Sequence, residues 1–401
     1  MRYNVAILTE AANSYSQGIT TGIANYISEQ GNWNISYEER ALDSPSPAWL
    51  KSWKGDGIIV RSKDPKVALM AVRTGAKVVD LGENRLPGLP TVYPDYAGVA
   101  NLAAEHFKAR QLKRFAYVGI EDRQFSEKRK SAFIKALGAS ENVHLFDLEQ
   151  DGISASAFLP DSKLGKWLKS LPKPVGIMTC YDLVGLYVIQ ACMALEIPVP
   201  EEVSVIGVNN DLIQCRMSAI PLTSIAQNTE RAGYEAAKLL QSLMEGESQP
   251  EKDLIIPPLG IVERQSTDFW AFDDEIVKRA LHYIRLNACL GITVQDICES
   301  LNISRRLLER RFFRSVNRTV HDEIAIVQMN RAKDLLQNSH MSLVSVAKAV
   351  GFSNASHLSL AFKNTFGTTP GKIRRLGMQQ YGYEDDGAAA DCADNTAELK
   401  S

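Results

Sequence analysis

Motifs for enzyme catalysis are what residues 1–265 of this 401-residue sequence lack most clearly. They contain neither glycine-rich phosphate loop, G-x-G-x-x-G or G-x-x-x-x-G-K-[ST], and neither H-E-x-x-H nor G-x-S-x-G. Their two histidines, His106 and His144, lie in sequence contexts without an evident catalytic partner. We therefore expect a protein that is not an enzyme and that uses no cofactor.

Cysteine is scarce, and long apolar runs are missing. The six cysteines fall at irregular spacings, with no C-x-x-C pair and no nearby histidine pattern suited to zinc, so we expect no metal site. No uninterrupted apolar run reaches the roughly 18 residues that a membrane span requires. The opening residues lack the apolar segment of a signal peptide. These absences predict a soluble, cytoplasmic protein that makes no use of a membrane.

The net charge of −2 is low for a protein that binds nucleic acid, but the charge is unevenly distributed. Residues 273–376 hold 16 lysines and arginines against 9 acidic residues, whereas residues 377–401 hold 6 acidic residues and one lysine. Because positive charge is concentrated in one segment, that segment favours a polyanionic partner. The acidic, alanine-rich residues 377–401 are predicted to be disordered.

Residues 1–265 alternate short β-branched runs with helical patterns, which is typical of parallel sheets with helices on both faces. One sheet built from all of these runs would be unusually wide, so we expect a two-lobed α/β domain with a cleft between the lobes. Beyond this region the β-like runs cease, which predicts an all-α domain. The predicted strands are 5–8, 57–60, 77–81, 115–118, 175–178 and 203–207, and the predicted helices are about 17–29, 96–109, 127–137, 183–195 and 231–243.

An approximate internal repeat with a period of about 50 residues marks the C-terminal part. Ile297–Ser304 matches Val346–Ser353 at each apolar position, and each copy continues into a helix with a leucine and a phenylalanine four residues apart. In each copy a short helix ends at a turn residue, Asn302 or Gly351, and the serine that closes the match is placed to cap a second helix. The pattern predicts two helix-turn-helix motifs.

The polar positions of the second helices predict contacts with DNA. In the first copy arginines occupy the outward positions, so this helix can enter the major groove, and in the second copy the exposed first turn carries hydrogen-bonding side chains. A helix over 322–337 would join the copies and set their separation near one turn of DNA, about 34 Å. The alternative is that these polar residues form a solvated, charged helix face that does not contact DNA. The presence of two copies with matching apolar positions argues against this alternative. The predicted DNA-contacting residues are Arg305, Arg306, Arg310, Asn354, Ser356 and His357.

These motifs resemble the DNA-binding domain of the AraC family of transcription regulators, which consists of two such modules joined by one helix. The resemblance covers about Asp273–Arg375 and includes the closing signature of Val350–Ser353, Phe362–Lys363 and Phe366–Pro370. It implies that double-stranded DNA is a partner of this part of the chain.

Residues 1–265 resemble the periplasmic-binding-protein fold of LacI-type regulators, on Pro198–Asp211 and Pro221–Gln227. LacI-type proteins place their DNA-binding part before the sensor, whereas here it follows. This order resembles the xylose operon regulators. The resemblance implies a sugar-binding sensor domain at 1–265, a linker at 266–272, a double helix-turn-helix domain at 273–376 and a tail at 377–401.

A pentose site needs hydrogen-bonding groups around the hydroxyls and an aromatic face against the ring. In this fold the loops after the strands open into the cleft, so their polar residues are the candidates. The resemblance places Asp182 and Asn209 in the cleft, and Asn209 stands where these regulators more often have aspartate. Turn formation and helix capping are the alternative role for each residue. The candidates are Asn13, Ser14, Tyr15, Arg129, Asp182, Asn209, Asn210 and Gln227.

Together these patterns predict a sugar-responsive, sequence-specific transcription regulator that activates pentose utilisation genes. The expected partners are operator half-sites in double-stranded DNA, D-xylose as effector, RNA polymerase and a second copy of the chain in a homodimer. Four alternatives stay open. The first is that the effector is a different sugar or a non-sugar ligand, and the second is that the sensor binds a protein. The third is that the regulator acts as a repressor, and the fourth is that the first 265 residues are an enzyme.

Overall fold

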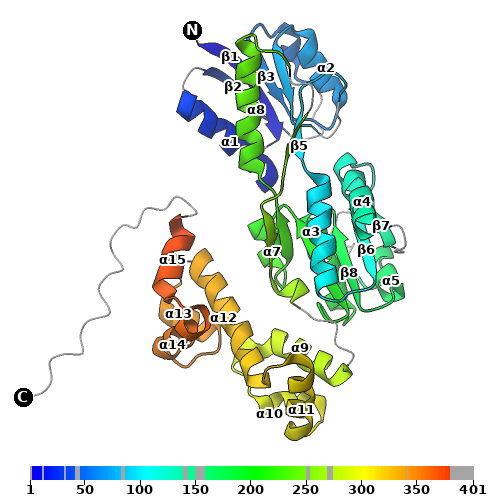
Figure 1. Cartoon of the computed structure of the whole chain (residues 1–401), viewed down its shortest axis with the longest axis vertical. Helices are drawn as coiled ribbons and strands as arrows, with labels where there is room; N and C mark the ends of the chain where they lie inside the picture. Colours follow the sequence, from blue (N-terminus) through cyan, green and yellow to red (C-terminus); the bar gives the residue numbers. More distant parts are fainter. Residues whose placement is uncertain are drawn as a thin grey trace, which may run out of the picture. The chain divides into compact units, whose positions relative to one another are not determined.

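In the computed structural model the chain forms two compact units, Met1–Ala271 and Phe272–Ser401 (Figure 1). The structure describes residues 2–10, 13–30, 33–40, 46–82, 86–138, 143–149, 159–249, 253–268, 274–339 and 341–379. No helix in this part of the chain is long and apolar enough to span a membrane. Within the same ranges, no group of three or more His, Cys, Asp or Glu side chains could hold a metal ion.

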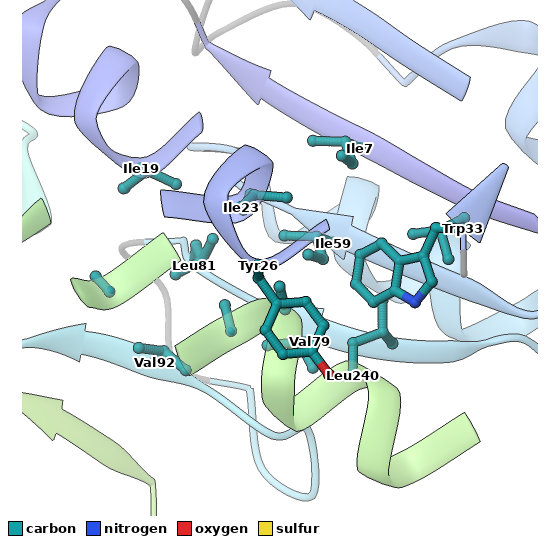
Figure 2. Packing of buried hydrophobic residues seen from close by; sticks show 14 of the residues in the cluster. Ile7, Ile19, Ile23, Tyr26, Trp33, Ile59, Val79, Leu81, Val92 and Leu240 are labelled. Carbon is teal, nitrogen blue, oxygen red and sulfur yellow. The ribbon is translucent and has the colours of Figure 1, made fainter. Parts of the chain in front are cut away.

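The first lobe of the N-terminal unit is built on a parallel sheet with strand order β2-β1-β3-β4. Its apolar strand residues, among them Ile7 and Ile59, pack against Ile23 and Tyr26 of a covering helix (Figure 2). The strands are β1 (Tyr3–Glu10), β2 (Trp33–Arg40), β3 (Gly57–Val60) and β4 (Lys77–Asp80), and the helices are α1 (Ser14–Gln30), α2 (Pro65–Arg73) and, from later in the chain, α8 (Thr229–Met244).

Helices α1 and α8 lie side by side on this lobe because glycines allow their backbones to approach (Figure 1). A Cβ atom on Gly22 would lie 1.9 Å from the carbonyl oxygen of Glu230, and one on Gly233 would lie 1.9 Å from that of Ile19. No other side chain fits at either position. The pairing joins two segments that are about 200 residues apart in sequence and completes the apolar core of the lobe.

The second lobe is built on a six-stranded sheet with order β12-β10-β9-β8-β6-β7, in which β12 is antiparallel to β10. The strands at its centre are buried along their whole length, as expected for a sheet covered on both faces. The strands are β6 (Phe115–Ile120), β7 (Val143–Leu148), β8 (Val175–Thr179), β9 (Val203–Val208), β10 (Thr223–Ala226) and β12 (Gly260–Val262), and the helices are α3 (Tyr96–Ala109), α4 (Gln124–Leu137), α5 (Lys163–Ser170), α6 (Asp182–Ala194) and α7 (Leu212–Met217).

The chain passes between the two lobes three times. Strand β5 (Val92–Pro94) leads from the first lobe into α3, the segment after β10 returns to α8, and β11 (Leu254–Ile256) leads to β12. β5 and β11 pair with each other as a short parallel sheet. These segments connect two separately packed cores, which is the two-lobed α/β architecture predicted from the sequence.

The C-terminal unit is entirely helical in its described part and contains two apolar clusters that share one helix. Leu308 and Phe312 are fully buried in the first cluster, and Leu358 and Phe362 are fully buried in the second. The long helix α12 contributes to both. The helices are α9 (Glu275–Asn287), α10 (Val294–Leu301), α11 (Arg305–Val316), α12 (Val320–Asn338), α13 (Leu343–Ala349), α14 (Ala355–Phe366) and α15 (Pro370–Gln379).

Each repeat forms two short helices joined by a turn, with a left-handed residue at the turn, Asn302 (φ 53°) or Gly351 (φ 82°). The predicted cap is right in the first repeat, where Ser304 accepts a hydrogen bond from the backbone N–H of Leu307. It is wrong in the second, where Asn354 rather than the preceding serine caps α14. The helix there begins one residue later, and an asparagine side chain caps as well as a serine.

The junction between the units differs from the predicted linker at its first two residues. Ser266 and Thr267 are fully buried, and the Ser266 hydroxyl donates to the carbonyl of Val205 at 2.6 Å. They therefore belong to the second lobe, because buried hydroxyls of this kind need fixed partners. Residues 269–273 and 380–401, which include most of the predicted linker and tail, lie outside the described residues.

Candidate ligand cavity and nucleic-acid interface

A cavity of about 200 Å³ lies in the N-terminal unit and is lined by residues from both lobes. The first lobe contributes the turn after β1 and the ends of β3 and β4, and the second lobe contributes the starts of helices that follow its strands. Five of the eight residues predicted to bind a sugar line this cavity: Asn13, Ser14, Tyr15, Arg129 and Asn209.

Asp182, predicted to be one of the two best sugar contacts, lies behind the cavity wall. Its side chain is fully buried, and its carboxylate accepts hydrogen bonds from the Ser224 hydroxyl at 2.5 Å and from the backbone N–H of Asp211 at 2.7 Å. Burial raises the pKa of this carboxyl to about 7, although both hydrogen bonds act to lower it. Asp182 therefore holds the loop after β9 in place and is not a wall residue.

Asn210 and Gln227 also lie outside the wall. The side chain of Asn210 points to Arg264, whose Nη2 atom donates to its Oδ1 at 2.7 Å. Gln227 is buried, and its Nε2 atom donates to Oδ1 of Asn209 at 2.7 Å. Gln227 thus holds the side chain of Asn209, which adopts a left-handed backbone conformation (φ 105°) that asparagine tolerates better than most residues.

Arg129 is the most enclosed charged group in the wall, with 3% of its surface exposed. Its guanidinium donates to the carbonyl of Cys180 and, at 3.4 Å, to Oδ1 of Asn209. It lies 5.2 Å from the ring centre of Phe125, which also lines the cavity. The helix α4 thus brings a rigid cation to the cavity with an aromatic face beside it.

Sequence reasoning missed several wall residues, most of them aromatic or charged. Phe125 and Tyr181 form an edge-to-face ring pair at 6.1 Å, and Tyr15 lies under the guanidinium of Arg61 at 5.1 Å. A search of the same strand-end loops for aromatics would have found two of them, since Phe125 follows β6 and Tyr181 follows β8. The missed polar and aromatic residues are Arg61, Tyr96, Arg123, Phe125, Tyr181, Asp211 and Gln214.

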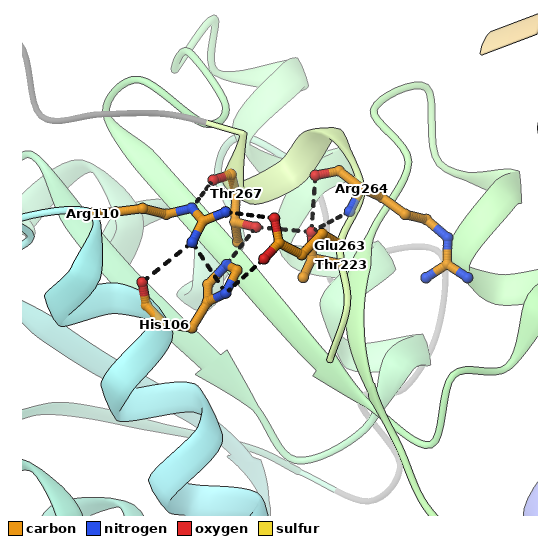
Figure 3. Close-up of polar contacts among 6 residues, drawn as sticks. All are labelled: His106, Arg110, Thr223, Glu263, Arg264 and Thr267. Atoms are coloured by element: carbon orange, nitrogen blue, oxygen red, sulfur yellow. Dashed lines mark hydrogen bonds and ion pairs between the residues drawn. The ribbon is translucent and has the colours of Figure 1, made fainter. Parts of the chain in front are cut away.

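A hydrogen-bond network holds the last described segment of this unit, residues 263–268, against the second lobe (Figure 3). Arg110 can only donate, so Nδ1 of His106, at 3.1 Å, must accept and Nε2 must donate to Thr267 at 2.9 Å. Thr223 in turn donates to the carbonyl of Arg264 at 2.9 Å and lies 2.8 Å from the Thr267 hydroxyl. Burial, with the charge of Arg110, lowers the pKa of His106 to about 3.

The arginines predicted to contact DNA lie on the exposed face of α11. Arg305, Arg306 and Arg310 are exposed, and Arg305 forms an ion pair with Glu309, one turn further along, at 2.8 Å. Arg311 is bound instead to Asp274 at 3.3 Å, which holds it against α9. In the second repeat, Asn354, Ser356 and His357 are exposed, and Oδ1 of Asn354 accepts from the N–H of His357 at 2.9 Å. The second helices of both repeats therefore present donors to solvent.

Three protein families match successive parts of the chain. Residues 4–102 match the XylR N-terminal domain, residues 104–267 match the periplasmic binding protein-like domain, and residues 297–376 match a helix-turn-helix domain. The first two matches meet within α3, the helix that follows the crossing from the first lobe to the second.

Two curated relatives align along almost the whole chain. The xylose operon regulatory protein of Haemophilus influenzae is 31% identical over 383 residues, covering 93% of this chain and 98% of the relative. That of Escherichia coli K12 is 29% identical over 390 residues, covering 94% and 98%. A solved structure of a xylose-binding transcription activator, XylR, is 28% identical, covers 94% of this chain and 98% of its own, and superposes with a TM-score of 0.79. The chain therefore belongs to the family of xylose operon regulatory proteins.

Proposed function

We propose that this protein is a transcription regulator whose DNA binding responds to a sugar held in the cavity between the lobes. The observation that carries the proposal is that the cavity and the exit from the sensor share one loop. Asn209 and Asp211 line the cavity, and Asn210 between them is bound to Arg264, which lies in the last described segment of this unit, residues 263–268. A ligand that moves this loop therefore acts on the segment that leads to the DNA-binding helices.

A pentose suits the cavity by size and chemistry. About 200 Å³ is below the roughly 300–1,000 Å³ of pockets for drug-sized ligands, and both hydrogen-bonding side chains and aromatic rings line it. Xylose operon regulatory proteins are the relatives that align along the chain, so D-xylose is the first sugar to test. A non-sugar ligand, a protein ligand and an enzyme activity have no comparable support, because the relatives that align along the chain are xylose operon regulatory proteins.

The proposed mechanism is a change in the balance between two conformations. The two conformations are an open and a closed arrangement of the lobes, and a sugar that contacts both lobes binds the closed one more tightly and so favours it. A coupling free energy of about 1–3 kcal/mol between sugar binding and DNA binding is enough for regulation. In a homodimer four helix-turn-helix motifs would read repeated half-sites. Activation of pentose utilisation genes in the cytoplasm, through RNA polymerase, is the proposed outcome, with repression by the sugar-free protein as the second candidate.

Two measurements on the full chain test the proposal. Isothermal titration against a panel of pentoses and hexoses should give saturable binding to at least one, and a duplex carrying the operator should bind with an affinity that changes when that sugar is added. Binding to duplex DNA should also weaken steeply with salt, because phosphate contacts release counterions. A protein that binds DNA identically with and without every sugar would contradict the sensor role.

A further inference from the structure

Two arginines in the wall of the cavity have buried guanidinium nitrogens without a hydrogen-bond acceptor in the described structure. Arg129 is 3% exposed, and its Nε atom has no hydrogen-bond partner in the described structure. The Nη1 atom of Arg123, another wall residue, is buried and equally without a partner there. Buried donors of this kind are costly unless a bound group accepts from them.

Asn209 adds a third donor to the same wall. Its Oδ1 atom accepts from Gln227 at 2.7 Å and from Arg129 at 3.4 Å. Since a guanidinium can only donate, the atom facing Arg129 must be the amide oxygen, and the amide nitrogen with its two N–H groups is left for the cavity. A carboxylate at this position would have accepted in every direction and would have paired with Arg129.

The charge of Arg129 is not balanced by a carboxylate within the described ranges. Its hydrogen-bond partners there are a backbone carbonyl and an amide oxygen, both neutral. Asp211 is the one carboxylate among the described residues that line the cavity, and its Oδ1 caps α7 by accepting from the N–H groups of Ile213 and Gln214. A buried cation without a counterion is unfavourable, and an anionic ligand group would remove that cost.

We propose that the ligand group that lies against Arg123, Arg129 and Asn209 is a carboxylate, so that the preferred effector is a sugar acid of pentose size. The inference rests on the proposed sensor function and narrows its ligand class. A hydroxyl of a neutral pentose accepts from one or two of these donors but brings no charge. A carboxylate offers two oxygens that accept from the Asn209 amide, and it brings the negative charge that the two guanidiniums lack.

The test compares D-xylonate with xylitol, an open-chain neutral compound that differs from it at one end, and with D-xylose, a neutral sugar that is a ring in solution. Isothermal titration of the full chain should show D-xylonate binding about tenfold or more tightly than either neutral compound, since hydrogen bonds to charged groups are the stronger kind. Asn209→Asp should reverse this order, because the new carboxylate pairs with Arg129 and repels the ligand anion. Asn101→Asp, the same change at an exposed position on α3, should leave it unchanged.

The outcomes separate the inference from the proposed function. If D-xylose binds the unaltered protein as tightly as D-xylonate, or if Asn209→Asp leaves the order of affinities unchanged, the carboxylate assignment is overturned and the sugar sensor stands. If none of the three probes binds at millimolar concentration but another neutral sugar does, the inference also falls. If no sugar and no sugar acid binds, the proposed function fails with it. A thermal unfolding curve of each variant shows that it is folded before it is compared.

Discussion

Asn210 accepts a hydrogen bond from Arg264 at 2.7 Å, and this contact joins the wall of the cavity to the strand segment that leaves the sensor. Arg264 is held at a second point, where Nη1 donates to the carbonyl of Leu222 at 2.9 Å. Asn210 itself has a left-handed backbone (φ 55°), a conformation that asparagine tolerates better than most residues. The loop that lines the cavity is therefore bonded directly to the exit segment within one lobe.

Arg264→Ala should separate sugar binding from the DNA response. Arg264 is not among the residues that line the cavity, so we expect the effector's dissociation constant to change little, while the coupling of about 1–3 kcal/mol between ligand and DNA is largely lost. Operator affinity measured with and without effector gives the coupling directly. Arg114→Ala, which removes an arginine bound to the Lys173 carbonyl elsewhere in the lobe, is the control. A full response in Arg264→Ala would show that the signal takes another route.

Asp182→Ala should destabilise the N-terminal unit and thereby weaken the response indirectly. The change leaves the Ser224 hydroxyl and the Asp211 N–H without their buried acceptor, which costs about 1–3 kcal/mol for each group. Chemical denaturation followed by tryptophan fluorescence measures the loss. Asp182→Asn should cost less, since the amide oxygen still accepts. An Asp182→Ala protein with unaltered stability but no sugar binding would place this residue in direct contact with the ligand after all.

Arg310→Ala should weaken operator binding by about 1–3 kcal/mol if the arginine reads a base, and the loss should differ between operator and random duplex. Arg306 is its exposed neighbour on α11 and is the second variant to make. Arg279→Ala removes the same charge from the exposed face of α9 and controls for the general attraction to phosphates. Competition gel shifts at fixed salt measure all three. Equal small losses would assign α11 a purely electrostatic role.

The buried His106 should make the second lobe less stable in mild acid. Its pKa is lowered to about 3 by burial and then by Arg110, while the unfolded chain takes up the proton near 6.5. The stability is therefore complete above about pH 6.5 and is lost as the pH falls towards 3, by about 2 kcal/mol at pH 5. Urea unfolding of the protein and of His106→Gln at about pH 7 and about pH 5 measures this. A variant that loses as much stability as the parent over this interval would argue against His106 as the cause.

Much of the fold was predictable because its signals are local. The predicted strands 57–60, 115–118 and 175–178 correspond to β3, β6 and β8, whose apolar residues are buried on both faces. Strand β2 was not predicted, because Trp33–Arg40 is mostly polar. It lies at the edge of its sheet, where polar and charged side chains are common. The cavity was predictable in part, because strand-end loops converge in this fold, but which side chain of a loop turns inward is set by packing.

The sequence by itself determined the order of the two units, the repeated helix-turn-helix pattern and the outward arginines of α11, because periodicity and turn residues depend on neighbours a few positions away. The tertiary structure decided that Asp182 is a support while Arg123 and Tyr181 form the wall. It also decided the orientation of the Asn209 amide and brought Asn210 to Arg264 across 54 positions of sequence. Those relationships depend on contacts between distant segments, and hydrogen-bond direction and burial exist only once the segments have packed together.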